Sequence, residues 1–311
     1  MAICSFPGKW EAPGPNATAG RRPALASGVG TAYKGVAETR AAFMIGRIAG
    51  FLGLLALGLA LAIAVAGPGA RLGLWDWSFG LSLIRKVSAP DAIPGLPVPP
   101  LLLAAGLAFI GAIAAFVSKL MRIGLFALVA AALAGGAISV PLKMRAAFEA
   151  NPFIHEVTTD FDNPPAIIAA AALPRTNPPE YRGSDPVPRA ENGLTVAEAQ
   201  RAAFPDIQPI MTSGALEEAR DRTRAVITAM KMEIIAEGPD GDQPGAGWRI
   251  EAVNTSTWFG FKDDFIVRLT PRAEGGVRID IRSKSRVGGS DLGANAARVR
   301  EFMKRFNAAA D

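Results

Sequence analysis

The sequence predicts an integral membrane protein that carries three transmembrane helices and, after them, one soluble α+β domain. The first observation behind this prediction is a set of three long apolar runs without a charge, each with Lys or Arg close by. The second is charge: residues 1–145 hold thirteen Lys and Arg against four Asp and Glu, a net +9, whereas residues 146–311 hold twenty against twenty-four, a net −4. The third is that helical and strand periodicities follow one another in the second part.

Residues 1–43 mix Gly, Pro, Ala, Ser and Arg without a periodic apolar pattern, which predicts a disordered segment. The segment also lacks the apolar core of a secretory signal peptide. An alternative is that translation begins at Met44, so that the upstream residues are not part of the protein.

The membrane domain is expected at residues 44–145, with spans at Ile48–Gly67, Leu101–Val117 and Ile123–Val140. The first span has twenty residues, which is about 30 Å of helix and matches the hydrocarbon core of a bilayer. One such run could be a buried helix of a soluble protein, but three of them, none amphipathic, argue against that alternative. The short connection Ser118–Arg122 makes the last two spans an antiparallel hairpin.

The segment Arg71–Val87 lies between the first two spans and combines Trp75 and Trp77 with Arg85 and Lys86. Aromatic rings beside cations are typical of a segment that lies at the membrane surface. A re-entrant membrane element is the alternative. Five Lys and Arg residues flank the spans on each side of the membrane, so the positive-inside rule does not orient the chain.

The soluble domain is expected at residues 146–311 and begins with a Pro-rich arm. Its two parts, Asn151–Ile167 and Ala172–Gly193, hold too many prolines for a helix or a central strand. The arm is therefore expected to be irregular chain that packs on the regular elements after it.

Helices and strands follow the arm. Thr195 and Glu198 form a capping box that opens a short helix, and Ser213 is expected to cap a longer one. Four strand candidates come next, and they are Lys231–Glu237, Trp248–Thr257, Asp264–Thr270 and Val277–Ser283. The closing helix has Ser290 or Asp291 as its cap. We therefore predict an antiparallel four-stranded sheet covered on one face by two helices, with the Pro-rich arm beside it.

Four phrases of the soluble half carry a resemblance to a known family. They are EVTTDFDNPPAI (Glu156–Ile167), AFPDIQP (Ala203–Pro209), TWFGFKDDFIVRL (Thr257–Leu269) and RIDIRSKSRVGGSDLGANAARVREF (Arg278–Phe302). Together they resemble the family called domain of unknown function 1499, over roughly residues 148–307 and behind the membrane region. The family occurs in bacteria and plastids, exported as single domains or placed behind membrane spans, and has no assigned reaction. The resemblance therefore implies a domain outside the cytoplasm and implies no activity.

A candidate anion or ligand site lies where the last strand leads into the last helix. Its residues combine cations, a hydroxyl, a glycine pair and a helix amino terminus, and they are Arg282, Ser285, Arg286, Gly288, Gly289 and Asp291. The alternative is structural. In it the glycines make the turn, Asp291 occupies the positive end of the helix as its cap, and the arginines pair with carboxylates.

A second set of charged residues is expected to form structural ion pairs, and it consists of Asp263, Asp264, Arg268 and Asp280. Adjacent residues on a strand point to opposite faces, so Asp263 and Asp264 are not expected to meet as a catalytic pair. A buried pair between one of these carboxylates and Arg282 or Arg286 would instead hold the sheet in register.

These patterns favour a binding protein over an enzyme. The three spans contain no charged residue, which argues against a transporter or a proton pump. We predict no catalytic residues, cofactor or metal, because the single histidine, His155, and the single cysteine, Cys4, lack the spacing of a metal site. The basic residues flank the spans rather than form a patch on a folded domain, so nucleic acid is not an expected partner.

We therefore expect a multi-pass protein of the bacterial inner membrane, with a periplasmic domain that binds a ligand or a partner. The expected partners are the lipid bilayer and another membrane or envelope protein. The alternative is a membrane-anchored hydrolase that acts on an anionic substrate through Asp263 or Asp264, with Arg282 and Arg286. Burial separates the two hypotheses: closed ion pairs beneath the arm weaken the hydrolase, whereas convergence on an open pocket supports it.

Overall fold

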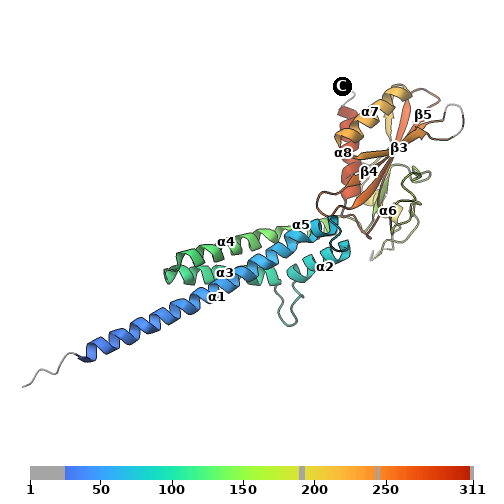
Figure 1. Cartoon of the computed structure of the whole chain (residues 1–311). Helices are drawn as coiled ribbons and strands as arrows, with labels where there is room; N and C mark the ends of the chain where they lie inside the picture. The colour runs from blue at the N-terminus through green and yellow to red at the C-terminus, as the bar shows by residue number, and fades with distance from the viewer. Residues whose placement is uncertain (1–24, 189–192, 242, 244–245, 309–311) are drawn as a thin grey trace, which may run out of the picture.

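The computed structural model describes residues 25–188, 193–241, 243 and 246–308. A long bundle of helices carries a sheet domain at one end, the end at which the first helix stops (Figure 1). The helices of the bundle are α1 (Leu25–Arg71), α2 (Trp77–Ser88), α3 (Pro100–Val117), α4 (Met121–Ala137) and α5 (Ser139–Ala150).

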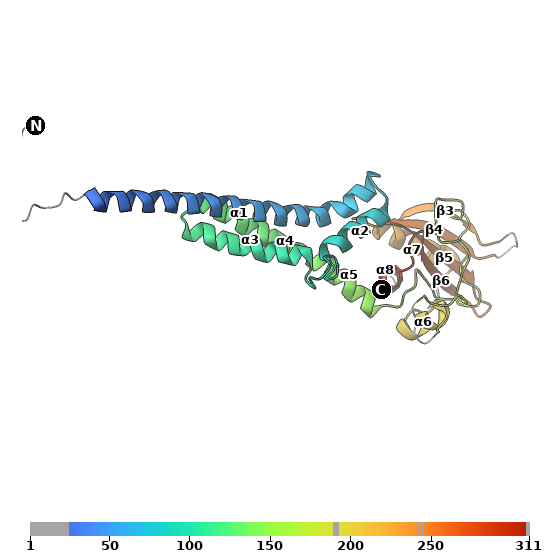
Figure 2. The same ribbon diagram turned by 90° about the horizontal axis from the view of Figure 1, so that it is seen from below.

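Small residues let the helices of the bundle approach closely. Helices α1, α3 and α4 lie side by side (Figure 2), and their contacts bury Ala49, Ala56, Ala108 and Ala127 completely. A Cβ atom added at Gly111 would lie 3.3 Å from the Cβ of Ala49, so a larger residue here would require the facing helix to shift by a few tenths of an ångström. Close packing of small residues is the usual source of helix association in lipid, where burial of apolar surface gives little driving force.

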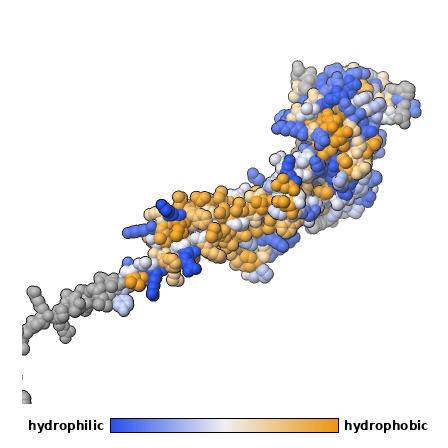
Figure 3. All heavy atoms as spheres, viewed as in Figure 1, coloured by the Kyte–Doolittle hydropathy of each residue, from blue (hydrophilic) through white to orange (hydrophobic). Residues whose placement is uncertain are grey.

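Three helical stretches are long and apolar enough to cross a membrane, and they are Tyr33–Arg71, Pro100–Val117 and Met121–Ala150. Figure 3 shows hydrophobic residues over most of the visible surface of the bundle. The sequence prediction of three apolar helices ahead of a sheet-containing domain is thus confirmed.

The structure differs from the prediction before the first span. Residues 25–43, which we expected to be disordered, form the beginning of α1. After Pro23 the chain has no proline before Pro68, and it is rich in alanine, so nothing in this stretch breaks a helix. Residues 1–24 lie outside the described part of the structure.

The segment predicted to lie at the membrane surface contains α2. Asp76 caps this helix, because its carboxylate accepts a hydrogen bond of 2.8 Å from the backbone N–H of Ser78. The helix buries Gly80, Ile84 and Val87 against its neighbours. It therefore packs on the end of α1 and carries aromatic residues at its amino terminus.

The sheet of the C-terminal domain has six antiparallel strands, so the prediction of four is wrong. They are β1 (Glu156–Thr158), β2 (Ile210–Thr212), β3 (Glu233–Pro239), β4 (Trp248–Thr255), β5 (Lys262–Pro271) and β6 (Val277–Ser285). The strand order is β1-β6-β5-β4-β3, and β2 also pairs with β6. The two missed strands have three residues each, too few to show a periodicity of their own. β1 lies within Asn151–Ile167, which we expected to be irregular chain, and β2 follows Pro209. Both complete the edge of β6.

Two helices, α7 (Leu216–Ala229) and α8 (Ala294–Ala308), cover one face of this sheet. Their core is apolar and fully buried, and it includes Phe265, Val267, Ile279, Phe302 and Phe306. The short helix α6 (Val196–Ala203) begins at the predicted capping box. Helix α7 does not begin as predicted, because its cap is Ala215 rather than Ser213 and no side chain accepts a hydrogen bond there.

The separate core of the domain leads to a first prediction. A fragment spanning residues 146–311 is expected to be soluble and to unfold cooperatively, because its helices and strands bury a core of their own. Circular dichroism and urea unfolding of the purified fragment check this. A spectrum without fixed tertiary structure, or aggregation, would show that the domain needs the helices for folding.

Candidate functional site

The sheet face opposite α7 and α8 is lined with buried charge. Alternation along the strands places on this face Asp264 and Arg268 of β5 with Asp280, Arg282 and Lys284 of β6. Each of these residues is less than a tenth exposed. The chain after β1, residues 159–188, contains most of the predicted Pro-rich arm and is called the arm from here on. It covers these side chains and forms hydrogen bonds to them. The charged side chains are thus enclosed between two layers of the protein.

The first charged group is the Asp264 triad, which consists of Arg175, Asp264 and Arg286. The Asp264 carboxylate is 1% exposed and pairs with Nη2 of Arg286 at 2.7 Å and with Arg175 of the arm. Nε and Nη1 of Arg175 have no hydrogen-bond partner among the described residues. Burial raises the pKa of Asp264 and lowers the pKa of Arg175. Desolvation of the charges is therefore only partly offset by their pairing.

The second group is the Glu156 triad, which consists of Glu156, Arg282 and Lys284. The carboxylate of Glu156 on β1 pairs with Nη2 of Arg282 at 2.8 Å and with Nζ of Lys284 at 3.0 Å. Arg282 also donates to the carbonyl oxygens of Pro165 and Pro179 in the arm. Burial lowers the pKa of Lys284. The triad joins the edge strand, the sheet and the arm.

A third group balances two arginines with two aspartates. Arg268 donates to Asp160 of the arm at 2.9 Å and to Asp280 at 3.1 Å. Arg278 pairs with Asp280 at 3.0 Å and with Asp160 at 3.2 Å. The group is neutral by count and attaches the beginning of the arm to β5 and β6.

Glu251 of β4 holds the middle of the arm. Its carboxylate accepts hydrogen bonds of 3.1 Å from the backbone N–H groups of Ile168, Ala169 and Ala170. Glu251 is 2% exposed and has Arg249 at 3.3 Å. A buried carboxylate thus satisfies three backbone donors of an irregular segment, which would otherwise be costly to bury.

Asp263 faces the other side of the sheet. Its carboxylate pairs with Nη2 of Arg298 on α8 at 2.6 Å, whereas Asp264 points towards the arm. The two carboxylates therefore do not meet. All four residues that the sequence assigned to structural ion pairs do lie in ion pairs.

The candidate anion site is not assembled. Arg282 and Arg286 project to the arm face, where carboxylates bind them, whereas Ser285 projects to the helix face and accepts a hydrogen bond from Asn295. Asp291 caps α8, since its carboxylate accepts from the N–H groups of Gly293 and Asn295.

The glycine pair of that site also has structural contacts. The carbonyl oxygen of Gly288 accepts from the side chain of Asn177, and Gly289 lies against the Phe153 ring. The predicted site thus splits between the two faces of the sheet.

Sequence reasoning missed Glu156, Arg175 and Lys284 as charged partners. Lys284 could have been found, because it lies two residues from both Arg282 and Arg286 and so shares their face of a strand. Glu156 and Arg175 lie in Pro-rich chain, where the sequence shows no periodicity. Among the described residues no group of three or more His, Cys, Asp and Glu could hold a metal ion.

The loop between β4 and β5 seats the domain on the bundle. Arg71, the last residue of α1, donates hydrogen bonds of 2.8 and 2.7 Å to the carbonyl oxygens of Ser256 and Thr257. The Trp258 ring lies against Gly67, where a Cβ atom would come within 2.6 Å of the ring. Gly260 lies against Arg71 and has φ +72°, a backbone conformation that glycine adopts at the lowest cost.

Aromatic rings extend this contact to α2. Phe261 packs edge-to-face on Trp77, with the ring centroids 5.9 Å apart, and stacks on Phe259 at 5.1 Å. Phe259 also covers Gly80 of α2. The loop, α1 and α2 thus share one small buried apolar cluster.

A recess of about 240 Å³ opens at this junction, and we call it the junction cleft. Its lining comes from the end of α1, the beginning of α2, the arm and the domain, and includes Trp75, Trp77, Phe261, Lys262 and Arg286. Arg286 of the Asp264 triad is thereby at its wall. The cleft thus brings the end of the bundle and one member of the buried charged face together.

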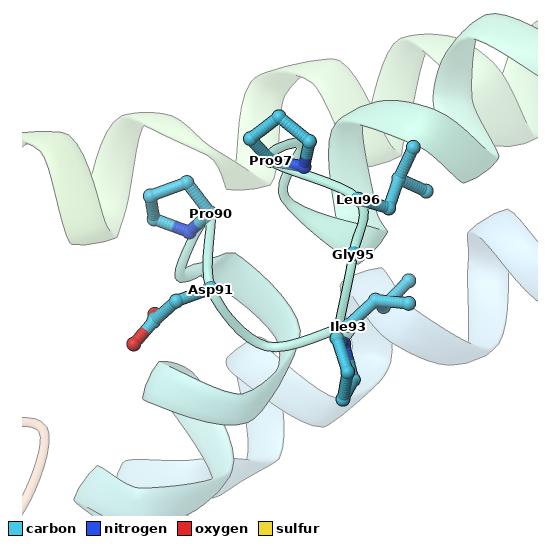
Figure 4. Close-up of a pocket in the computed structure, with 7 residues that line it drawn as sticks. Pro90, Asp91, Ile93, Gly95, Leu96 and Pro97 are labelled. Atoms are coloured by element: carbon cyan, nitrogen blue, oxygen red, sulfur yellow. The ribbon is translucent and has the colours of Figure 1, made fainter.

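A wider recess of about 540 Å³ lies within the loop Pro90–Pro97 between α2 and α3 (Figure 4). One loop forms all of its lining, and Asp91 is the only charged residue in that lining. The carboxylate of Asp91 points away from Ile93 and Leu96, which lie on the opposite side of the loop (Figure 4). This recess presents no convergent polar groups, unlike the junction cleft.

The match to a family model covers the domain just described. Residues 156–306 match the family described as protein of unknown function (DUF1499). The resemblance inferred from the sequence is therefore confirmed. No curated protein matches the chain. The DUF1499 segment contains both triads and the loop that seats the domain, whereas α1 and α2, which form the other wall of the junction cleft, precede it.

Proposed function

We propose that the chain is a membrane-anchored binding protein whose DUF1499 domain is held against the membrane surface by the α1–α2 end of the bundle. One observation carries this proposal: the charged face of the sheet is closed by ion pairs beneath the arm, and the recess that reaches it lies at the junction with the bundle. A binding site shared by the domain and its anchor suits a protein that takes its ligand at the membrane.

The hydrolase alternative loses support from the same geometry. Asp263 and Asp264 lie on opposite faces, and each is bound by arginine. Arg282 is 2% exposed and saturated by Glu156 and two arm carbonyl groups. A general base needs access to substrate or water, which these carboxylates lack in the described structure.

A second prediction concerns topology. Three spans would place the two termini on opposite sides of the membrane, and the resemblance to the DUF1499 family implies an exported domain, so we propose an inner-membrane protein with its carboxyl terminus in the periplasm. A reporter that is active only after export, fused at residue 311, is expected to be active. A reporter that works only in the cytoplasm is expected to be silent at the same position. The reverse pattern would contradict the assignment.

The binding role is tested by affinity capture of the full-length protein solubilised in mild detergent. We expect a defined lipid, small molecule or envelope protein to co-purify in stoichiometric amount. The matched control is the fragment 146–311, which lacks the α1–α2 wall of the cleft and is expected to retain less of that ligand. A purified protein that hydrolyses anionic esters, and that loses this activity but not its stability on Asp264→Asn, would establish the hydrolase instead.

A further inference from the structure

Two of the charged groups beneath the arm each hold one more cation than carboxylate. The Asp264 triad holds two guanidinium groups and one carboxylate, and the Glu156 triad holds two cations and one carboxylate. Every one of these six side chains is at most 8% exposed. An uncompensated charge in such surroundings is strongly destabilising. Each triad becomes neutral only if it gains one negative charge or loses one proton.

Only one of the two triads can restore balance by itself. Lys284 belongs to the Glu156 triad, and a buried lysine can lose its proton. The Asp264 triad has no such route, because its cations are Arg175 and Arg286 and arginine stays protonated in proteins. Nε and Nη1 of Arg175 also lack an acceptor among the described residues. An anion from outside the chain would supply the missing negative charge.

The junction cleft gives an anion access to this triad. Arg286 lines the cleft, and so does Pro174, the neighbour of Arg175 in the chain. Lys262 adds an exposed cation at the same wall. Asp76 is the one carboxylate in the lining, and the N–H of Ser78 binds it as the cap of α2. The cleft and the triad together hold three cations against two carboxylates.

The position of the cleft indicates where the anion comes from. The apolar run of α1 ends at Gly67, and the cleft is lined by Ala70, Trp75 and Trp77 just after it. Tryptophan at the end of a span is typical of the headgroup region of a bilayer. The volume of about 240 Å³ is below the range of about 300–1,000 Å³ that is usual for whole small ligands. It therefore suits a headgroup whose acyl chains stay in the bilayer.

We propose that the junction cleft binds the phosphate group of an anionic phospholipid, with Arg286 and Lys262 of its lining, and the excess positive charge of the Asp264 triad, as its counter-charges. This inference rests on the proposed binding function and names the class of its ligand. The aromatic rings of the cleft pack beside the glycerol backbone, and the phosphate completes the charge of the Asp264 triad. A free phosphate ester carries the same anion, but it lacks the chains that anchor it at this depth.

Native mass spectrometry of the full-length protein in detergent tests the proposal, with titration of phosphatidylglycerol, phosphatidylcholine and glycerol 3-phosphate. We expect one phosphatidylglycerol to be retained at least about tenfold more tightly than phosphatidylcholine, and Lys262→Glu to weaken that binding by about tenfold or more. Lys304→Glu is the matched control, because Lys304 is an exposed lysine on α8, and it should leave binding unchanged.

A second variant separates binding from folding. Arg175→Gln leaves Asp264 and Arg286 as a balanced pair, so it is expected to abolish the preference for phosphatidylglycerol while the lipid-free protein stays folded by circular dichroism. Equal retention of the two lipids, or an unchanged preference in both Lys262→Glu and Arg175→Gln, would overturn the proposal. If glycerol 3-phosphate binds as tightly as the lipid, the acyl chains do not contribute, and the proposal that the anion is a lipid headgroup is wrong. If another ligand co-purifies in the capture experiment while phosphatidylglycerol does not bind, this inference fails and the proposed binding function stands.

Discussion

Replacement of Glu156 by glutamine is expected to lower the free energy of unfolding by about 3–5 kcal/mol. Glu156 is 1% exposed and is the shared carboxylate of Arg282 and Lys284. Glutamine keeps the size of the side chain but leaves two buried cations without a counter-charge. Lys284 can then lose its proton, whereas Arg282 cannot. The loss should be visible as a lower midpoint of urea unfolding of the full-length protein in detergent.

Glu301→Gln is the matched control for this substitution. Glu301 pairs with Arg305 at 2.6 Å on the surface of α8, with both side chains more than two fifths exposed. Exposed pairs within a helix contribute little, so this change should leave the unfolding midpoint nearly unchanged. Equal effects of the two substitutions would show that the charged face does not stabilise the domain.

Asp264→Asn is expected to have an effect of similar size, again about 3–5 kcal/mol. The substitution removes the one carboxylate between Arg175 and Arg286, neither of which can deprotonate. The arm should also separate from β5, because Arg175 attaches the arm there. Proteolysis of the native protein within residues 159–188 should therefore become faster than in the unmodified chain.

Asp206→Asn provides the comparison for Asp264→Asn. Asp206 pairs with Arg300 at 2.6 Å, but its side chain is 53% exposed, so the loss should be at most about 1 kcal/mol. A fully stable Asp264→Asn protein with an intact arm would contradict the structural role of the triad. It would also reopen the hydrolase hypothesis, in which Asp264 serves chemistry rather than folding.

The sequence predicted the features that depend on local pattern. Apolar runs of span length predicted the helices around Ile48–Gly67 and the later hairpin, and the alternation of Val277, Ile279 and Ile281 predicted β6 with its buried face. The capping box at Thr195 fixed the start of α6. Each of these signals lies within one element, so no knowledge of distant partners was needed.

Features that depend on distant pairing could not be predicted. Glu156 meets Arg282 and Lys284 across 126 and 128 positions of the chain, and β1 has three residues that become a strand only beside β6. The residues of the candidate anion site are divided between two faces for a different reason. Arg286 and Ser285 are adjacent in sequence, so they project to opposite faces of the strand. Arg286 therefore lies beneath the arm, whereas Ser285 lies beneath α8.

The seating of the domain on α1 decides whether the junction cleft exists. A Cβ atom at Gly260 would lie 3.4 Å from the Cβ of Arg71, close to the separation of about 3.5–4.5 Å in disulfides. Cys4 would first be replaced by serine, and cysteine then introduced at Arg71 and Gly260. The control pairs Arg71→Cys with Gly275→Cys, because Gly275 also has a positive φ, +91°, but lies in the turn between β5 and β6.

Thiol labelling in native membranes, before and after mild oxidation, is the most direct measurement. The cysteines at positions 71 and 260 are expected to become resistant to a maleimide reagent after oxidation and to recover on reduction. The cysteines at positions 71 and 275 should stay reactive throughout. If the 71/260 pair stays as reactive as the control, then the domain does not rest on α1, and neither the junction cleft nor the binding function built on it can stand.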